Sequence, residues 1–383
     1  MSKVKLGDVA IEHKETCKGS KDGYPIVGLE HLIPEEVTLT AWDEGSDNTF
    51  TKMFRKGNVL FGRRRAYLKK AAVAPFDGIC SGDITVIEAI PDRILPELLP
   101  FIIQNDELFD FAVGKSAGSL SPRVKWEHLK NYEFELPDMD KQRELAELLW
   151  AMDATKKSYQ KLIAATDELV KSQFMEQFSM SQAESNGWSI VPVSSVVIKP
   201  LSGEWGQEDT DGTGVKVLRT TNFTDSGFID YTEVVRRSIE LKKVEAKALR
   251  DGDILIEKSG GSDTKPVGRV VFYQETSENF LFNNFTALLR PNTPKLNSRF
   301  LFTFLFVTYW NGGTKLYENK TTGIHNLKLA DYLVNTMIPI PPIEDQEVFA
   351  AFVEQSNKSK FELEQALSEL TATYKRIIAK NLG

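Results

Sequence analysis

The sequence predicts an α+β protein with two copies of a globular domain, each followed by one long helix. The first observation is a repeat, because residues 131–178 and 335–382 align without a gap. Its matched pairs include Asn131 with Asn335, Pro137 with Pro341, and Gln142 with Gln346. A period this long indicates a duplicated domain and helix rather than a solenoid. The second observation is that short, β-branched apolar runs precede each of the two repeated segments. Predicted strands and helices are mixed there without strict alternation, as in α+β domains.

Composition places the chain among ordinary globular proteins. Its 383 residues are enough for two or three domains with their own cores, and 41% of them are hydrophobic and 26% charged. No apolar run reaches 18 residues, and the first residues lack the apolar core of a signal peptide. The two cysteines, Cys17 and Cys80, form no CxxC motif. We therefore expect a reduced, cytoplasmic protein.

Five segments follow from the repeat and from local composition. We expect a globular domain at 1–136, a helix at 137–180, a polar linker at 181–187, a second globular domain at 188–340 and a second helix at 341–383.

The two globular segments share an order of predicted elements. Each contains four short strands bounded by Gly, Asp or Pro. The strands are expected at 24–29, 58–62, 70–76 and 83–90 in the first domain, and at 215–219, 253–258, 268–273 and 285–290 in the second. An apolar helical stretch follows in each, at 95–113 or 298–310, and then a glycine-led segment, at 118–129 or 323–333.

Both long helices carry residues that step three and four positions apart, the a/d pattern of a coiled coil. The expected seam consists of Leu145, Leu148, Met152, Tyr159, Leu162 and Leu169 in the first helix, and Phe349, Phe352, Leu363, Ala366 and Leu370 in the second. Further apolar residues widen the stripe, so both helices are expected to face more than each other: Leu149, Ile163 and Val170 in the first helix, and Val353, Leu367 and Tyr374 in the second. The alternative is a helix packed only on its own domain. A length of about 40 residues, against about 11–12 for a typical helix, favours an intramolecular pair.

Basic residues concentrate in one segment of an acidic chain. A net charge of −7 argues against a general attraction to nucleic acid. Residues 51–76 nevertheless hold eight basic residues and no acidic one. Arginine both reads guanine bidentately and clamps phosphate. The candidate DNA contacts of this first loop are Arg63, Arg64, Arg65, Tyr67, Lys69 and Lys70.

The corresponding loop of the second domain is rich in glycine and serine. Gly260 and Gly261 allow the backbone to approach a phosphate closely. Its candidate DNA contacts are Lys258, Ser259, Ser262, Lys265 and Arg269. A solvated basic face is the alternative to DNA contact for both loops, and for the second loop it is an equal one.

In this order, and repeated, these motifs resemble the specificity subunit of a type I restriction–modification system. The resemblance covers essentially the whole chain. It depends on the segments GNVLFGRRRAYLKKAAVA and GDILIEKSGGSDTKPVGRVVF, and on the helix starts LPDMDKQ and IPPIEDQ. It implies two target-recognition domains, each reading one half of a split DNA site. It also implies an antiparallel pair of coiled-coil helices that sets the gap between the half-sites.

The resemblance also implies partners and further DNA contacts. Two methylation (M) subunits, which would carry S-adenosylmethionine, and the restriction (R) subunits would assemble around this chain on double-stranded DNA. The glycine-led segments would face DNA through Ser119, Ser121, Arg123 and Lys125, and through His325, Asn326 and Lys328. Three adjacent arginines in the first loop correspond to glycines in the second, so the two domains are expected to read different half-sites.

The sequence lacks familiar catalytic motifs. It has no GxxxxGK[ST] loop, no Asn-Pro-Pro or Asp-Pro-Pro segment of an adenine methyltransferase, and no histidine cluster at metal-ligand spacing. We therefore expect no catalysis, cofactor or metal on this chain, with the chemistry on partner subunits. The alternative function is a protein-interaction scaffold without a DNA role, with two globular heads on a paired-helix adaptor. The acidic composition favours that alternative, whereas the basic loop and the resemblance favour DNA recognition.

Overall fold

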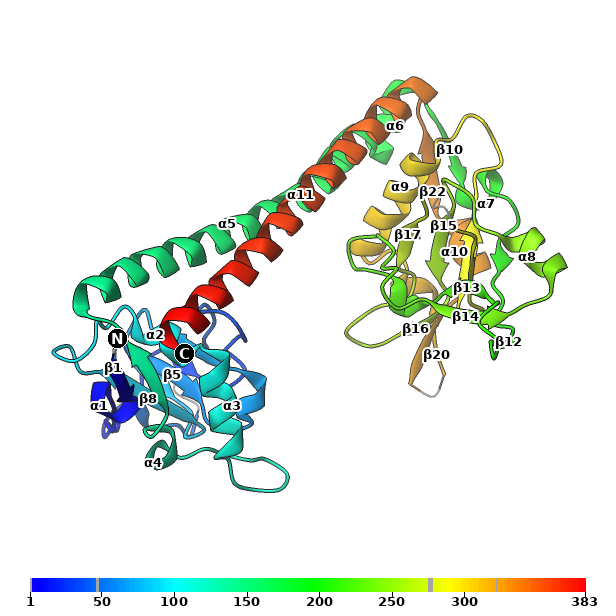
Figure 1. Ribbon diagram of the computed structural model, residues 1–383. Helices are drawn as coiled ribbons and strands as arrows, with labels where there is room; N and C mark the ends of the chain where they lie inside the picture. Colours follow the sequence, from blue (N-terminus) through cyan, green and yellow to red (C-terminus); the bar gives the residue numbers. More distant parts are fainter. Residues whose placement is uncertain (1, 46–47, 275–277, 322) are drawn as a thin grey trace. The chain divides into compact units, whose positions relative to one another are not determined.

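The computed structural model describes residues 2–45, 48–274, 278–321 and 323–383. The chain forms two compact units (Figure 1). Unit 1 is Met1–Leu162 with Leu363–Gly383, and unit 2 is Ile163–Glu362. Two long helices, α5 (Met139–Phe178) and α11 (Ile343–Leu382), contribute residues to both units. In the described part of the chain, no helix is both long and apolar enough to span a membrane.

In the part of unit 1 that the structure describes, three small sheets combine with short helices. The sheets have the strand orders β1-β9, β2-β8-β5-β6 and β3-β7-β4. The strands are β1 (Ser2–Lys5), β2 (Ala10–Glu12), β3 (Ile26–Val27), β4 (Lys52–Phe54), β5 (Val59–Gly62), β6 (Ala71–Val73), β7 (Gly78–Cys80), β8 (Ile84–Ala89) and β9 (Glu133–Leu136). The helices are α1 (Leu6–Val9), the 3₁₀ turn η1 (Ala66–Leu68), α2 (Leu99–Ile103), α3 (Asp106–Gly114) and α4 (Trp126–Leu129).

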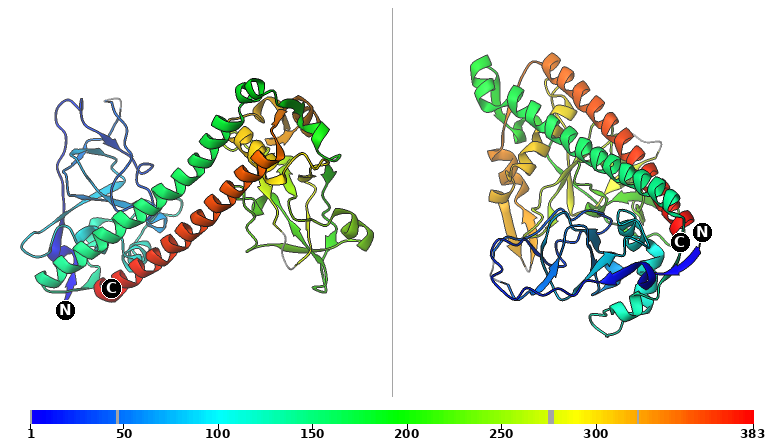
Figure 2. Two further views of the ribbon diagram at one scale, coloured as in Figure 1. Left: turned by 90° about the horizontal axis from the view of Figure 1, so that it is seen from above. Right: turned by 90° about the vertical axis from the view of Figure 1, so that its left-hand side faces the viewer.

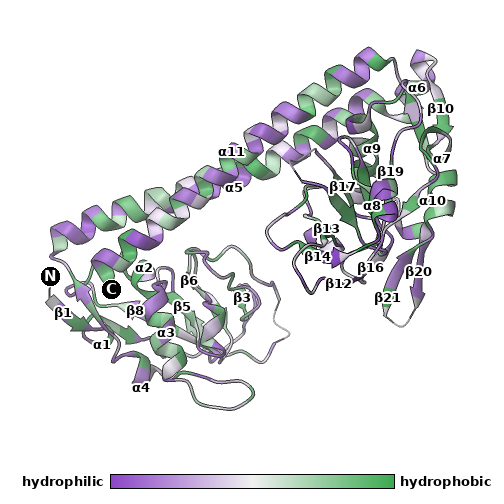
Figure 3. Ribbon diagram, turned by 45° about the vertical axis from the view of Figure 1, so that its right-hand side comes forward, coloured by the Kyte–Doolittle hydropathy of each residue, from purple (hydrophilic) through white to green (hydrophobic). Residues whose placement is uncertain are grey.

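The described residues of unit 2 form four sheets, in the orders β10-β22, β11-β19-β15-β17, β12-β14-β13-β18 and β16-β21-β20. The strands are β10 (Ser189–Pro192), β11 (Leu201–Ser202), β12 (Gln207–Glu208), β13 (Val215–Leu218), β14 (Val235–Ser238), β15 (Ile254–Glu257), β16 (Ser259–Gly261), β17 (Val270–Phe272), β18 (Phe280–Phe282), β19 (Thr286–Leu289), β20 (Glu318–Thr321), β21 (Ile324–Leu327) and β22 (Met337–Ile340). The helices are α6 (Met180–Asn186), α7 (Val193–Val196), η2 (Thr220–Asn222), α8 (Leu241–Lys247), α9 (Ser298–Trp310), η3 (Lys315–Tyr317) and α10 (Leu329–Asn335). Figure 3 shows hydrophobic colours on β17 and α9 and hydrophilic colours along β20.

The two units repeat one strand order, which confirms the predicted α+β duplication. The sheet β2-β8-β5-β6 of unit 1 corresponds to β11-β19-β15-β17 of unit 2. The parallel pair of β3 with β7 corresponds to the parallel pair of β13 with β18. All eight strands expected from the sequence are found, and they occupy equivalent places in the two units. The sheet β16-β21-β20 is the main addition in unit 2.

A buried glutamine fixes the start of each long helix. The Gln142 side chain donates to the Pro137 carbonyl at 2.9 Å and accepts from the Leu95 amide at 2.8 Å. Gln346 likewise donates to the Pro341 carbonyl at 2.8 Å, and it accepts from the Asn297 amide at 2.9 Å. Each amide therefore ties its helix to the preceding domain. The repeated Pro-x₄-Gln pattern is a structural latch.

The long helices run antiparallel within each unit (Figure 2). In unit 2, Phe349 of α11 packs against Phe174 and Phe178 of α5, with ring centroids 5.5 and 5.1 Å apart. Farther along α11, the buried Lys360 ammonium lies 2.6 Å from the Asp167 carboxylate of α5. Residue numbers on α11 rise as those on α5 fall. An ion pair with a buried ammonium group can fix the register of two helices.

The inward face of α5 differs from the predicted seam. Leu148, Leu162 and Leu169 are 46%, 51% and 47% exposed, although they were expected in the seam. Leu149 is buried instead, and Ile163 and Val170 are half-buried. A straight α-helix has 3.6 residues per turn, so its face drifts away from a strict seven-residue pattern. The other predicted seam residues of both helices are buried or half-buried: Leu145, Met152, Tyr159, Phe349, Phe352, Leu363, Ala366 and Leu370.

Two local predictions are corrected by capping interactions. The expected linker 181–187 falls in α6, because the Ser179 side chain caps its first turn and Gly187, at φ 67°, ends it. The helical stretch expected at 95–113 is divided into α2 and α3. Asn105 causes the break, since its side-chain oxygen accepts from the Glu107 amide and starts a new helix. Small polar residues therefore mark helix ends here rather than a linker or a helix interior.

Candidate nucleic-acid interface

Three loops of unit 1 meet beyond the end of β5. The chain leaves this strand at Gly62 and enters the arginine triplet. The Arg63 amide donates to the Asp83 carbonyl at 3.0 Å, and the Arg63 carbonyl accepts from the Val124 amide at 3.0 Å. The Arg65 amide donates to the Pro122 carbonyl at 2.8 Å. The structure thus brings together the basic loop and the glycine-led segment, which the sequence offered as separate candidates.

One carboxylate organises the arginines of this junction. Asp83 accepts two hydrogen bonds from Arg123, at 2.7 and 3.2 Å, and lies 3.5 Å from Arg64. Arg64 also donates to the Ser121 hydroxyl at 3.1 Å. The hydrogen bond from Arg123 holds the pKa of Asp83 below its ordinary value, and the charges of Arg64 and Arg63 act in the same direction. The cluster therefore keeps a positive excess while two of its guanidinium groups are held in place.

Arg63 faces a broad groove of about 780 Å³. Its Nε is buried and has no hydrogen-bond partner among the described residues. The groove is lined by Glu12, Lys14, Glu15, Thr16, Thr49, Phe50, Thr51, Lys52, Arg63, Ser81, Gly82, Asp83 and Arg123. Four basic and three acidic side chains line it, so the groove offers both hydrogen-bond donors and acceptors to a ligand. The base edges in the major groove of DNA also present both donors and acceptors, so they can pair with such a lining.

Among the remaining candidates of the first loop, some side chains are exposed and others bind neighbouring residues. Arg65 and Tyr67 are exposed, and Arg65 holds a left-handed backbone at φ 55°, which a non-glycine residue rarely adopts. Lys69 forms an ion pair with Asp106 at 2.6 Å, and Lys70 donates to the Leu29 carbonyl at 2.7 Å. Both lysines therefore support the loop. Ser119 and Lys125 of the glycine-led segment are exposed.

The equivalent segments of unit 2 also meet. Strand β16 pairs with β21, with Ser259 opposite Asn326 and Gly261 opposite His325. The Leu327 amide donates to the Lys258 carbonyl at 2.8 Å. The second loop and its glycine-led segment therefore form one small sheet, with β20 at its edge.

Arg269 lies inside unit 2 rather than on its surface. Its guanidinium donates to both oxygens of the buried Glu257, at 3.0 and 3.1 Å. It also donates to the carbonyls of Phe223 and Thr220, at 3.1 and 3.2 Å. These bonds tie η2 to the sheet. Because only 13% of its side chain is exposed, against 42% for Arg123, Arg269 supports the loop and offers little surface to DNA.

Other candidates of unit 2 are held by neighbouring side chains. Lys265 pairs with Asp225 at 2.7 Å, and Lys258 donates to the Ser202 hydroxyl at 2.9 Å. Burial, followed by the nearby charge of Lys247, lowers the pKa of Lys258. His325 is buried, with Nδ1 2.9 Å from the Glu318 carboxylate. The exposed members of the predicted set are Ser262, Lys265 and Lys328, and Ser259 and Asn326 are half-buried.

Residues outside the predicted set complete both surfaces. Asp83 and Lys52 enter the groove of unit 1, and Asp263 forms ion pairs with Lys320 and His325 in unit 2. A search for basic residues misses the carboxylates. The only sequence signal for Asp83 is its place in a Ser-Gly-Asp turn directly before β8.

Among the described residues, His31 lies in a group of carboxylates that the spacing along the chain did not indicate, in addition to the ion pairs of His13 and His325 with carboxylates. His31 gathers with Glu30 and Asp43, with ligand atoms within 4.8 Å of one another. Its Nδ1 accepts a hydrogen bond from the Gly28 amide at 2.9 Å. A neutral ring bonded in this way carries its proton on Nε2, the nitrogen that lies 3.5 Å from Asp43. The backbone amide of Gly28 and the exposed carboxylate of Asp43 therefore lie at opposite nitrogens of the His31 ring.

The family comparison decides between the two functions left open by the sequence. The family model of the type I restriction modification DNA specificity domain matches residues 1–165 and 213–371. The chain belongs to this family. It is a type I specificity subunit, and its function is sequence recognition of DNA, so the scaffold alternative is set aside. One matched region falls mainly in each unit, which fits recognition of a site in two parts.

The chain is similar to known proteins over nearly its full length. A putative type I restriction enzyme MjaX specificity subunit from Methanocaldococcus jannaschii is 20% identical over 397 residues, covering 93% of this chain and 87% of the relative. The type I restriction–modification S subunit from M. genitalium shares the fold, with a TM-score of 0.59 and 12% identity over 100% of this chain and 96% of that one. A chain from a study of assembly and conformational transition of the type I system gives a TM-score of 0.58 and 22% identity, covering 99% and 97%.

Proposed function

We propose that unit 1 of this specificity subunit reads one half-site of a bipartite DNA sequence and unit 2 reads the other. The observation that carries this proposal is the groove of unit 1, which Arg63 lines together with the ion pair of Arg123 and Asp83. Unit 2 places a different set of side chains on the corresponding elements. The same scaffold with different side chains is what two unlike half-sites require.

The candidate DNA contacts of unit 1 are of two kinds: side chains held in place by neighbouring residues, and exposed side chains. Arg64 and Arg123 are held by Asp83, so they can present a defined geometry to base edges. The exposed Arg65 and the residues near it suit phosphate contacts, which position the protein without reading sequence. In unit 2 the corresponding exposed groups are Lys265 and Lys328. These roles make the arginine junction the centre of sequence discrimination in unit 1.

Two methylation subunits are proposed to dock on the long helices. Outward leucines lie on α5, namely Leu148 and Leu162 in unit 1 and Leu169 in unit 2. On α11, Val348 and Phe361 are 74% and 58% exposed. The three leucines are spaced by 14 and 7 residues, so they share one face of α5, and a docked partner would cover this face. Because the helices repeat, each is proposed to serve one methylation subunit, and restriction subunits would join through that complex.

Catalysis is assigned to the partners. The methylation subunits would hold S-adenosylmethionine and receive the target base, flipped out of the duplex, while this chain fixes the site. The chain itself is proposed to be non-catalytic and to act in the cytoplasm. The antiparallel helices would set the spacer, so removal of one heptad from a helix should change the recognised spacer by a fixed step.

Methylation-sensitive sequencing of a host that expresses this chain with its partner subunits tests the proposal. The expected result is one motif with two defined parts and a fixed gap. Substitutions confined to the groove of unit 1 should alter one part of the motif and leave the other intact. A motif with a single continuous part, or changes in both parts after a substitution in unit 1, would contradict it.

A further inference from the structure

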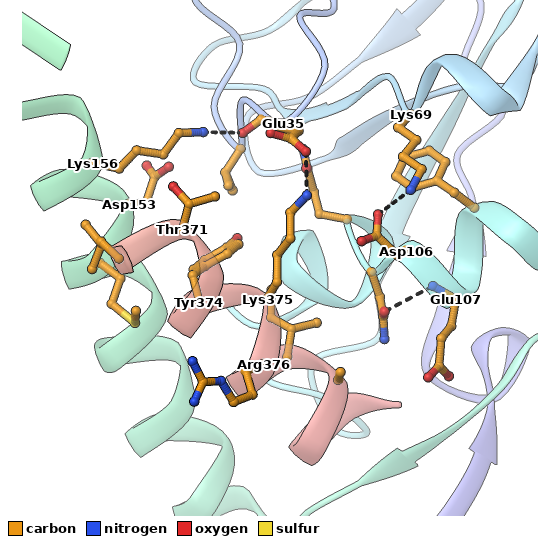
Figure 4. Close-up of a pocket in the computed structure, with 18 residues that line it drawn as sticks. Glu35, Lys69, Asp106, Glu107, Asp153, Lys156, Thr371, Tyr374, Lys375 and Arg376 are labelled. Atoms are coloured by element: carbon orange, nitrogen blue, oxygen red, sulfur yellow. Dashed lines mark hydrogen bonds and ion pairs between the residues drawn. The ribbon is translucent and has the colours of Figure 1, made fainter. Parts of the chain in front are cut away.

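A partly enclosed cavity of about 400 Å³ lies in unit 1, between the globular part and the ends of the two long helices (Figure 4). Phe109, Met152, Leu370 and Ile378 supply much of its apolar lining. Its size falls within the range of about 300–1,000 Å³ that is typical of small-molecule sites. It is separate from the groove that carries Arg63 and Arg123.

The duplicated chain offers an internal comparison for this cavity. The gap-free repeat makes Ile378 the counterpart of Phe174, and Leu382 the counterpart of Phe178. In unit 2, Phe174 packs against Phe300 and Phe304 of α9, with ring centroids 5.4 and 6.3 Å apart. Aromatic rings thus fill the wedge between helix and domain in unit 2. In unit 1 the counterpart of Phe174, Ile378, is a smaller aliphatic residue that lines the cavity.

The cavity also holds an unsatisfied polar group. The Tyr374 hydroxyl is buried and has no hydrogen-bond partner among the described residues. Burial raises the pKa of this hydroxyl well above its ordinary value, so it stays protonated and acts as a donor. Tyr374 projects among the residues drawn around the cavity (Figure 4). A buried donor without an acceptor costs free energy, so a ligand that accepts its hydrogen bond would be stabilised there.

Charges around the cavity balance. Glu35 pairs with Lys375 at 2.6 Å, and Lys69 pairs with Asp106 at 2.6 Å (Figure 4). The full lining contains four cationic side chains and four carboxylates. The lining therefore has no net charge, which favours a neutral ligand.

We propose that this cavity binds a neutral aromatic or heteroaromatic molecule of one or two fused rings, with a hydrogen-bond acceptor placed against the Tyr374 hydroxyl. The rings of such a molecule take the place that phenylalanine side chains occupy in unit 2. The acceptor satisfies the orphaned hydroxyl. The site is independent of the DNA-reading function.

Isothermal titration calorimetry with isoquinoline tests the proposal, because its ring nitrogen accepts a hydrogen bond. Indole, of similar size but with a donor in place of the acceptor, is the comparison probe. Both are titrated into the full chain, alone and assembled with its methylation partner. We expect saturable, single-site binding of isoquinoline. Tyr374→Phe should weaken isoquinoline about five- to tenfold, as for one lost hydrogen bond, and leave indole unchanged.

Ile378→Phe copies the side chain of Phe174 into unit 1 and should abolish binding of both probes. Thr373→Phe adds the same ring at an exposed position of α11 outside the cavity lining, and it should retain binding. Thermal melts check that each variant is folded, and a crystal soaked in isoquinoline locates the ring. The proposal is overturned by absent binding, by equal affinity in Ile378→Phe, or by a cavity that holds only water. Binding to the free chain that disappears in the assembled complex would assign the cavity to a partner side chain instead.

Discussion

Asp83 offers the sharpest test of how unit 1 recognises DNA. Asp83→Asn removes the charge that holds Arg123 at 2.7 Å and Arg64 at 3.5 Å. Loss of one bidentate base contact costs about 1–3 kcal/mol, so affinity for the cognate duplex should fall by about five- to 150-fold. The same change adds one net positive charge to the groove. Affinity for a scrambled duplex should therefore rise, with a slope of log K against log salt that is steeper by about 0.9.

Fluorescence anisotropy with the assembled complex measures both effects, using the motif found by sequencing and a scrambled duplex at two salt concentrations. Asp110→Asn is the matched control, since Asp110 is an exposed carboxylate of α3 outside the groove. It should change both affinities equally. A purely structural role for Asp83 would weaken binding to both duplexes. If Asp83→Asn left the ratio of cognate to scrambled affinity unchanged, the arginine junction would not read sequence.

The same variant tests the linkage between Asp83 and acid stability. The hydrogen bond from Arg123 lowers the folded-state pKa of Asp83 below its unfolded value. The ion pair therefore contributes stability above the ordinary carboxyl pKa of about 3.9, and this contribution is lost as pH falls through the lowered value. Urea unfolding at several pH values should show a smaller acid loss in Asp83→Asn than in the wild type.

Three further predictions follow from named contacts. Alanine at all of Arg63–Arg65 should weaken cognate binding by several kcal/mol if two or more bidentate pairs of about 1–3 kcal/mol are lost, as measured at matched salt; unchanged affinity would remove this loop from the interface. Gln346→Leu should lower the free energy of unfolding by about 3 kcal/mol, because it leaves a buried amide and two carbonyls without their partner, whereas the exposed Gln355→Leu should be near neutral in urea titrations. Asp167→Asn should cost more stability than Lys360→Met, since only the first leaves a buried ammonium unpaired, and the reverse order would exclude Lys360 as a charged buried group.

The sequence predicted the scaffold well because the scaffold is repeated. Strand positions emerged from β-branched runs between turn residues, and the topology of both units confirms their equivalence. Helix starts emerged from proline and acidic first turns, and Asp138 does accept from the Lys141 amide at 2.9 Å. The Pro-x₄-Gln match was visible as a pattern. Its cause, the latch through Gln142 and Gln346, needed the backbone groups that three-dimensional folding brings to each amide.

The exposure of individual side chains was harder to predict. The sequence of α5 allows either Leu148, which the heptad pattern predicts, or its neighbour Leu149 to face inward. Only the packing shows that Leu149 is buried and Leu148 is exposed. Arg269 and Lys265 look alike in sequence, yet one binds the buried Glu257 and the other pairs at the surface. Such differences depend on which carboxylate the fold places nearby. Spacing along the chain holds no information on those distant partners.

Which residues the two units share, and which differ between them, indicates the function of the duplication. Groups that join helix to domain are retained, as the paired latches of Gln142 and Gln346 show. The groups that follow β5 in unit 1 and β15 in unit 2 have diverged. Unit 1 has arginines around Asp83, whereas unit 2 has the small sheet β16-β21-β20, with Asp263 paired to Lys320. A scaffold that needed two identical surfaces would retain both sets. A protein that reads two unlike half-sites from one fold must retain the first set and vary the second, as this chain does.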